Sequence, residues 1–239
     1  MSKHERRQAR SPRELARVAL PLMGTWGAGL AVMIIVAGQS DDRAGQLLMD
    51  PSFTLGLRWY TGLVSNLGIL AWTVGAAAAF AGAWMCRMRG RDRAAGFLLG
   101  GAALGSLLLA DDLFQFHAVL VPTELDLPKI VGQAVLGGAA FAWLAMNHRE
   151  IRRTHFHLLI ASAVALAASV LVDSVFAPAP GEGWNVVEDG AKFLGILAWS
   201  AYFVVTTREI ARSVYVDALL MWPDDAFESV YGALDDVDV

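Results

Sequence analysis

Residues 156–176, FHLLIASAVALAASVLVDSVF, form an apolar stretch in which Asp173 is the single acid and no Lys or Arg occurs. A helix needs roughly 20 apolar residues to cross the hydrocarbon core of a bilayer, so this stretch is long enough to span a membrane. The composition of the chain agrees, because 56% of its 239 residues are hydrophobic and its mean hydropathy is +0.46. Soluble domains of this length normally carry fewer apolar residues. The sequence therefore predicts an integral membrane protein.

Five further stretches have similar length and hydropathy. The six predicted spans cover about 17–37, 61–86, 95–117, 128–146, 156–176 and 187–207. The predicted fold class is an all-α, polytopic six-helix transmembrane bundle. On this division residues 1–16 form a basic arm, residues 17–207 form the membrane domain, and residues 208–239 form a helix extension with an acidic tail.

Most Lys and Arg residues fall in four segments that alternate along the predicted topology. These segments contain Lys3, Arg6, Arg7, Arg10, Arg13, Arg17, Arg87, Arg89, Arg91, Arg93, Arg149, Arg152, Arg153, Arg208 and Arg212. Because cytoplasmic loops are enriched in Lys and Arg, both termini are predicted to be cytoplasmic. The expected location is the plasma (inner) membrane. The lipid bilayer is the expected partner, and no nucleic-acid partner is expected.

Glycine is concentrated in the predicted third span, at Gly96, Gly100, Gly101 and Gly105. Two of its spacings are small-xxx-small, which lets helix backbones approach closely in a membrane. This helix is therefore expected to be central, and it is the expected contact for a homo-oligomer or another membrane protein. Asp112 lies in line with Gly101 and Gly105 on a regular helix, so it is expected to face protein.

A polar stripe runs along the predicted last span. Spacings of four and three alternate through Glu188, Lys192, Gly195, Trp199, Tyr202 and Thr206. The opposite positions are apolar, so the polar stripe is expected to face protein and the apolar one lipid. Glu188 and Lys192 are also spaced for an ion pair within the helix, which offers a purely structural account of both charges.

Charged and amide side chains gather near the outer ends of the predicted spans. The candidate metal ligands are Asp111, Asp112, Asp173, Glu188, Asp189 and His117, and the other candidate pocket residues are Asn66, Gln115, Gln133 and Lys192. The principal acids are Asp112, Asp173 and Glu188. On a regular helix His117 points away from Asp111 and Asp112, so its inclusion depends on local geometry.

The leading functional prediction is an outward-facing acidic pocket that binds a cation or a small cationic ligand. Oxygen-rich sites suit Ca²⁺, Mg²⁺ or Mn²⁺, and a histidine ligand shifts the preference towards a transition metal such as Zn²⁺. One alternative is a metal-dependent membrane enzyme acting on a lipid or envelope substrate. Another is a structural or accessory subunit whose charges only pair or cap helix ends. Whether the protein is an enzyme stays open.

Two cofactor classes are not expected. The segment from Glu188 to Lys192 resembles the retinal-binding lysine segment of microbial rhodopsins, but those proteins have seven helices, so no retinal is expected. No haem is expected, because the five histidines provide no pair at a shared depth in the membrane. Cys86 is the single cysteine, which excludes an intramolecular disulfide and a CxxC metal site.

Two short motifs carry a family resemblance. Asp111 to His117 reads DDLFQFH, and Glu188 to Ile196 reads EDGAKFLGI. These stretches resemble bacterial multi-pass membrane proteins in which DDLFxxHE closes one helix and EDGxKFLGI opens a later one. Ala118 stands where the first motif has its glutamate. The resemblance implies a membrane protein and supplies no activity.

Overall fold

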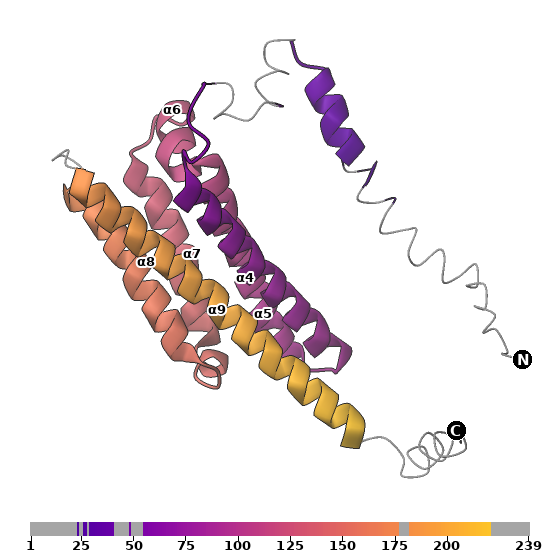
Figure 1. Ribbon diagram of the computed structural model, residues 1–239. Coiled ribbons are helices and arrows are strands. Elements are labelled where there is room, and N and C mark those ends of the chain that lie inside the picture. The colour runs from indigo at the N-terminus through magenta and orange to yellow at the C-terminus, as the bar shows by residue number, and fades with distance from the viewer. Residues whose placement is uncertain are drawn as a thin grey trace, which may run out of the picture. The chain divides into compact units, whose positions relative to one another are not determined.

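The computed structural model describes residues 23, 26–27, 29–40, 48, 55–176 and 182–220, and every regular element within these residues is a helix. The chain forms two compact units, residues 1–61 and 62–239. In the first unit residues 29–37 are helical. The second unit holds the five long helices of Figure 1.

The elements of the second unit follow one another through short turns. They are α4 (Leu63–Met88), α5 (Asp92–Phe114), the π-helical turn η1 (Phe116–Leu120), α6 (Val121–Glu124), α7 (Lys129–Ile151), α8 (Phe156–Phe176) and α9 (Glu182–Leu220). Five of these helices, α4, α5, α7, α8 and α9, are long and apolar enough to cross a membrane. The last five predicted spans therefore correspond to helices. The predicted first span, 17–37, lies partly outside the described residues, so the count of six stays a prediction.

Helix α5 ends before its predicted bound, and α9 extends as predicted. The third span was predicted to reach residue 117, but α5 ends at Phe114 because Gln115 adopts a left-handed backbone conformation with φ of 52°. At the other end of the chain α9 is continuous from Glu182 to Leu220, which agrees with the predicted extension beyond residue 207. Figure 1 shows this extension of α9, in yellow, projecting past the neighbouring helices.

Close packing of α4 against α9 organises the second unit. Gly68, Gly75 and Gly82 are spaced by seven residues on α4, and a Cβ atom at each would lie 3.2 Å or less from an atom of α9. Ile196, Ser200 and Thr207 supply those atoms in the same chain order, so the two helices run parallel. Small residues that recur every seven positions keep one face of a helix against its partner.

Two hydroxyl groups join the same pair of helices. Ser200 Oγ donates to the carbonyl oxygen of Ala71 at 2.6 Å, and Thr207 Oγ1 donates to that of Ala78 at 2.7 Å. Both donors and both acceptors are again seven residues apart. Hydroxyl groups that bond across helices satisfy themselves inside the bilayer and contribute roughly 0.6 kcal/mol each.

Aromatic rings fill the space between α5, α7 and α9. Trp143 of α7 stacks on Phe97 with ring centroids 5.5 Å apart, and it also contacts Trp199 and Phe203 of α9. Gly101 of α5 makes room for Phe203 and Trp143. Among the five spans α5 has the largest buried share, which confirms its predicted central place, and α7 has the smallest.

Three of the four glycines of α5 pack against other helices. Gly100 and Gly101 lie against Trp143, and Gly105 lies against Trp199. Gly96 has no atom within 4 Å of the position that its Cβ would take. Other helices of the chain therefore cover the small-residue face around Gly101 and Gly105. An oligomer through α5 stays a prediction, and such a contact would have to form around Gly96.

Substituting Gly75 with Val is expected to lower the free energy of unfolding in detergent by about 1–3 kcal/mol, because the new side chain would meet the Ser200 backbone. Gly96→Val is the matched control, since Gly96 faces open space, and its expected change is below about 0.5 kcal/mol. Circular dichroism during thermal unfolding measures both. Equal midpoints for the two variants would contradict the proposed α4–α9 seam.

Candidate functional site

The predicted acids gather where α5 and α8 end and where α9 begins, next to the start of α7. We call Asp111, Asp112, His117, Lys129, Gln133, Asp173, Glu188, Asp189 and Lys192 the acidic cluster. The polar stripe of α9 leads into this cluster. Its residues Gly195, Trp199, Tyr202 and Thr206 are buried, and Glu188 and Lys192 are half-buried. No residue of the opposite apolar stripe is buried. The prediction that the polar stripe faces protein is confirmed.

Asp112 joins three helices. Trp72 Nε1 of α4 donates to one carboxylate oxygen at 2.8 Å, and Lys192 Nζ of α9 lies 2.5 Å from the other. Trp72 is only 2% exposed, so its indole is fixed by packing. A carboxylate held by an ammonium and an indole N–H has both oxygens occupied, which offsets the loss of water around its charge.

The pair between Glu188 and Lys192 that their spacing allows is not the one that forms. Lys192 Nζ contacts Asp112 of α5, and no ion pair joins it to Glu188 among the described residues. The position of Lys192 on the protein-facing stripe explains this choice, because it directs the ammonium group towards α5.

Asp111 and His117 are brought together by the break in α5. After the left-handed Gln115 the chain enters the π-helical turn η1, so His117 folds back over the end of the helix. Its backbone N–H donates to Asp111 at 2.9 Å, and its ring Nδ1 lies 2.5 Å from the second carboxylate oxygen. Asp111 is 4% exposed. A regular helix through residue 117 would have kept these side chains apart.

Asp173 of α8 is held by α7. Lys129 Nζ donates to it at 2.7 Å, and Gln133 Nε2 donates at 2.8 Å. Lys129 and Gln133 are four residues apart, so they present both donors on one face of α7. In the described part of the chain these are the hydrogen bonds that join the side chains of α7 and α8.

Glu188 and Asp189 complete the negative charge of the cluster. Glu188 is half-buried and interacts electrostatically with Asp173, Asp189, Lys129 and Lys192. Neither Glu188 nor Asp189 forms an ion pair with another described residue. The cluster thus contains five carboxylates but only two lysines and one histidine, so it has an excess of negative charge.

Two predicted pocket residues lie outside this network. The side chains of Asn66 and Gln115 are exposed, and neither has a side-chain hydrogen bond among the described residues. The backbone of Gln115 instead terminates α5, and its carbonyl accepts from Val119 at 2.8 Å. Gln115 therefore shapes the site through its backbone conformation.

Two residues of the site were absent from the predicted list. Lys129 carries a signal in the sequence, because it precedes Gln133 by one helical turn. Trp72 carries a weaker signal: it lies between Gly68 and Gly75, on the face of α4 that packs in the bundle. Its partner Asp112 is 40 residues away, and no local spacing indicates that contact.

The metal assignment is not supported by the observed grouping. Over residues 55–176 and 182–220, and the few described before them, no group of three or more His, Cys, Asp or Glu side chains lies close enough to hold a metal ion. Asp111, Asp112 and Asp173 each already bind a donor from the protein. A divalent ion could bind these acids only if their present partners moved. The predicted ligand set therefore remains a prediction, and it comprises Asp111, Asp112, Asp173, Glu188, Asp189 and His117.

Comparison with known protein families gives a match over most of the chain. The model of a family described as a domain of unknown function (DUF8692) matches residues 23–206. This range includes four of the five long helices completely, most of α9, and every member of the acidic cluster. No curated protein and no solved structure matches the chain.

A double-mutant cycle with Asp112→Asn and Lys192→Met is expected to give a coupling energy of about 1–2 kcal/mol in thermal unfolding. Exposure of the lysine keeps this value below that of a fully buried pair. The control cycle uses Glu150→Gln and Arg153→Gln, a 3.5 Å pair with an exposed arginine, and its expected coupling is below about 0.5 kcal/mol. Equal coupling in the two cycles would show that Asp112 and Lys192 are solvated separately.

Proposed function

The chain belongs to the family of the domain of unknown function DUF8692, which carries no stated activity, and we propose its function from its own residues. The protein is a multi-pass membrane protein that binds a small monovalent cation or an organic amine at the acidic cluster. The observation that carries this proposal is Glu188, a half-buried acid beside Asp173 and Asp189 with no ion pair among the described residues.

The charge of the cluster favours a cation as the ligand. Lys129 and Lys192 neutralise two of five carboxylates, and His117 bonds to a third. In the low dielectric near a membrane interior, the remaining negative charge attracts cations more strongly than it would in water. Protein ammonium groups already bind Asp112 and Asp173, so an ammonium group on a ligand has the chemistry that this cluster accepts.

The proposed ligand is a monovalent cation and not a divalent metal. A calcium ion takes six to eight oxygen ligands at about 2.3–2.6 Å. The carboxylates of the cluster are spread over α5, α8 and α9, with lysine, tryptophan or glutamine donors on two of them. An amine needs only two or three acceptors, and Glu188 with Asp189 supplies them without breaking an existing pair.

Binding is tested with purified full-length protein in detergent and with methylammonium, sodium and calcium chlorides as probes. Methylammonium is expected to raise the thermal midpoint of the wild type, and Glu188→Gln is expected to weaken that binding at least tenfold. Glu150→Gln removes an acid at the far end of the bundle and should bind as the wild type does. A methylammonium response that is absent, or equal in Glu188→Gln and the wild type, would contradict the proposal.

A structural or accessory subunit is the second candidate. The observation that favours it is that three acids already pair within the chain, through Lys192, Lys129 and His117. On this account the cluster only ties α5 to α9 and α7 to α8. Failure of all three probes to bind, together with a strong loss of stability in Asp112→Asn, would support this candidate over cation binding. The metal-dependent enzyme has no arrangement of described residues in its favour.

We also propose the topology. The first span, 17–37, adds a sixth helix, both termini are cytoplasmic, and the acidic cluster lies on the outer side of a bacterial plasma membrane. The arginines at residues 87–93, 149–153 and 208–212 support this orientation, since basic loops stay in the cytoplasm.

Cysteine accessibility tests this orientation. In a Cys86→Ala background, Arg58→Cys is expected to react with a membrane-impermeant maleimide in intact cells. Arg152→Cys should react only after the cells are opened. The opposite pattern would invert the topology and would place the acidic cluster in the cytoplasmic half.

A further inference from the structure

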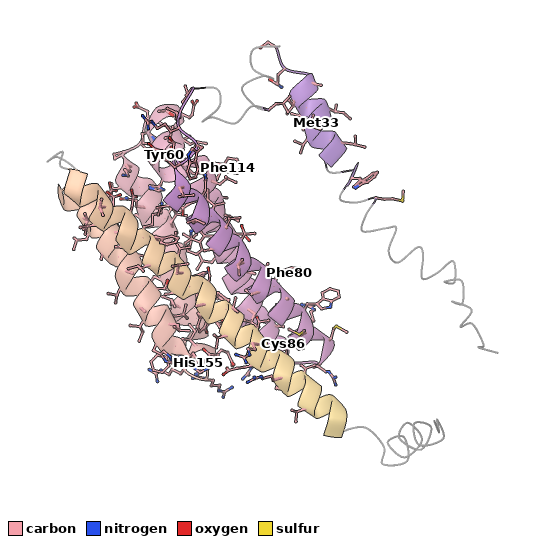
Figure 2. The ribbon with its side chains drawn as sticks, viewed as in Figure 1. Met33, Tyr60, Phe80, Cys86, Phe114 and His155 are labelled. Atoms are coloured by element: carbon pink, nitrogen blue, oxygen red, sulfur yellow. The ribbon has the colours of Figure 1, made fainter. Side chains whose placement is uncertain are left out.

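The end of the bundle opposite the acidic cluster carries exposed arginines from three segments. We call this set the basic end, and it consists of Arg87, Arg89, Arg93, Arg149, Arg152, Arg153, Arg208 and Arg212. Figure 2 shows His155 and Cys86 at this end of the bundle and Phe114 at the other. The side chains of all eight arginines are exposed.

Specific contacts to α9 hold the three segments together. From the turn between α4 and α5, Arg91 Nη1 donates to Ser213 Oγ at 2.9 Å. From the turn between α7 and α8, His155 Nε2 lies 2.6 Å from Glu209, and the Thr154 and Tyr202 hydroxyls are 2.7 Å apart. The basic end is therefore one surface arranged on both sides of α9.

Few acids balance this surface. Over the described residues of these three segments, the acids are Asp92, Glu150 and Glu209. Glu150 is paired with Arg153 at 3.5 Å, and Glu209 is paired with His155. A large excess of positive charge remains exposed, which attracts polyvalent or clustered anions.

Large apolar side chains beside the arginines place this surface at the edge of the bilayer. Trp84 is 63% exposed and Met88 is 73% exposed at the end of α4, and Phe156 at the start of α8 is also exposed. Exposed aromatic and apolar side chains next to arginines are typical of the level at which lipid headgroups lie. In a bilayer the guanidinium groups would then lie at the depth of the lipid phosphates.

We propose that the basic end is a binding surface for anionic phospholipid headgroups of the adjoining leaflet. This inference does not rest on the proposed cation site, because it concerns different residues at the other end of the helices. The planar guanidinium group binds phosphate oxygens through two parallel hydrogen bonds, and several such groups on one rigid surface favour lipids with accessible phosphates. Neutral zwitterionic lipids balance their phosphate with an ammonium group and bind less strongly.

Because the basic end contacts α9, lipid binding there is expected to stabilise the fold. The two turns that carry arginines also bind α9, through Ser213 and Glu209. Anionic lipid bound across the turns would therefore hold the extension of α9 in place. Lipid binding and the stability of the bundle are therefore expected to rise together.

The test uses purified full-length protein in neutral detergent, titrated with phosphatidylglycerol or phosphatidylcholine and followed by native mass spectrometry and by the thermal midpoint. Phosphatidylglycerol is expected to bind and to raise the midpoint, and phosphatidylcholine is expected to do neither. Each basic residue near an anionic surface contributes roughly fivefold to binding, so R149Q/R152Q should weaken phosphatidylglycerol binding roughly 25-fold.

Two further variants make the result specific. R43Q/R58Q removes the same charge from the first unit and should change binding less than twofold, and R149K/R152K keeps the charge and should retain most of the binding. Equal losses in R149Q/R152Q and R43Q/R58Q would overturn the proposal, as would equal binding of the two lipids. Competition by glycerol 1-phosphate at the concentration of the lipid would also overturn it in favour of a site for a soluble phosphate.

Discussion

The close approach of α4 and α9 is the constraint on which the other contacts of the second unit depend. Within a bilayer no hydrophobic driving force brings helices together, because lipid tails are as apolar as leucine side chains. Glycines at a spacing of seven on α4 let the backbones meet, and the hydroxyls of Ser200 and Thr207 bond to carbonyl oxygens of the facing helix. Helix α9 then carries the aromatic rings on which α5 and α7 pack, and Leu166 of α8 fits against its Gly195.

The two ends of the bundle treat charge differently for a physical reason. At the acidic cluster, the carboxylates of Asp111, Asp112 and Asp173 are mostly buried, so each is held by donors from the protein. At the basic end, the arginines are exposed, so their charge does not require a buried partner inside the protein. Helix α9 runs through both regions, with Lys192 in one and Glu209 in the other.

Parts of the acidic cluster could be predicted from local spacing. The protein-facing stripe of α9 and the inward position of Asp112 follow from helical periodicity, and both agree with the burial of these residues. The role of His117 did not follow, because the prediction assumed a regular helix. A left-handed Gln115 changes the direction of the chain, and only then does the His117 ring reach Asp111.

Composition and periodicity determined the helical class, the approximate positions of the five long helices and the face that α9 turns to protein, because these properties depend on residues close together in the chain. The tertiary structure decided which charges meet. The spacing of Lys192 and Glu188 allows a pair one turn apart, yet the Lys192 ammonium binds Asp112 of another helix, and Trp72 completes that site from a third. The direction of a long side chain depends on the packing around its helix, and that packing comes from contacts such as Gly75 on Ser200, between residues far apart in the sequence.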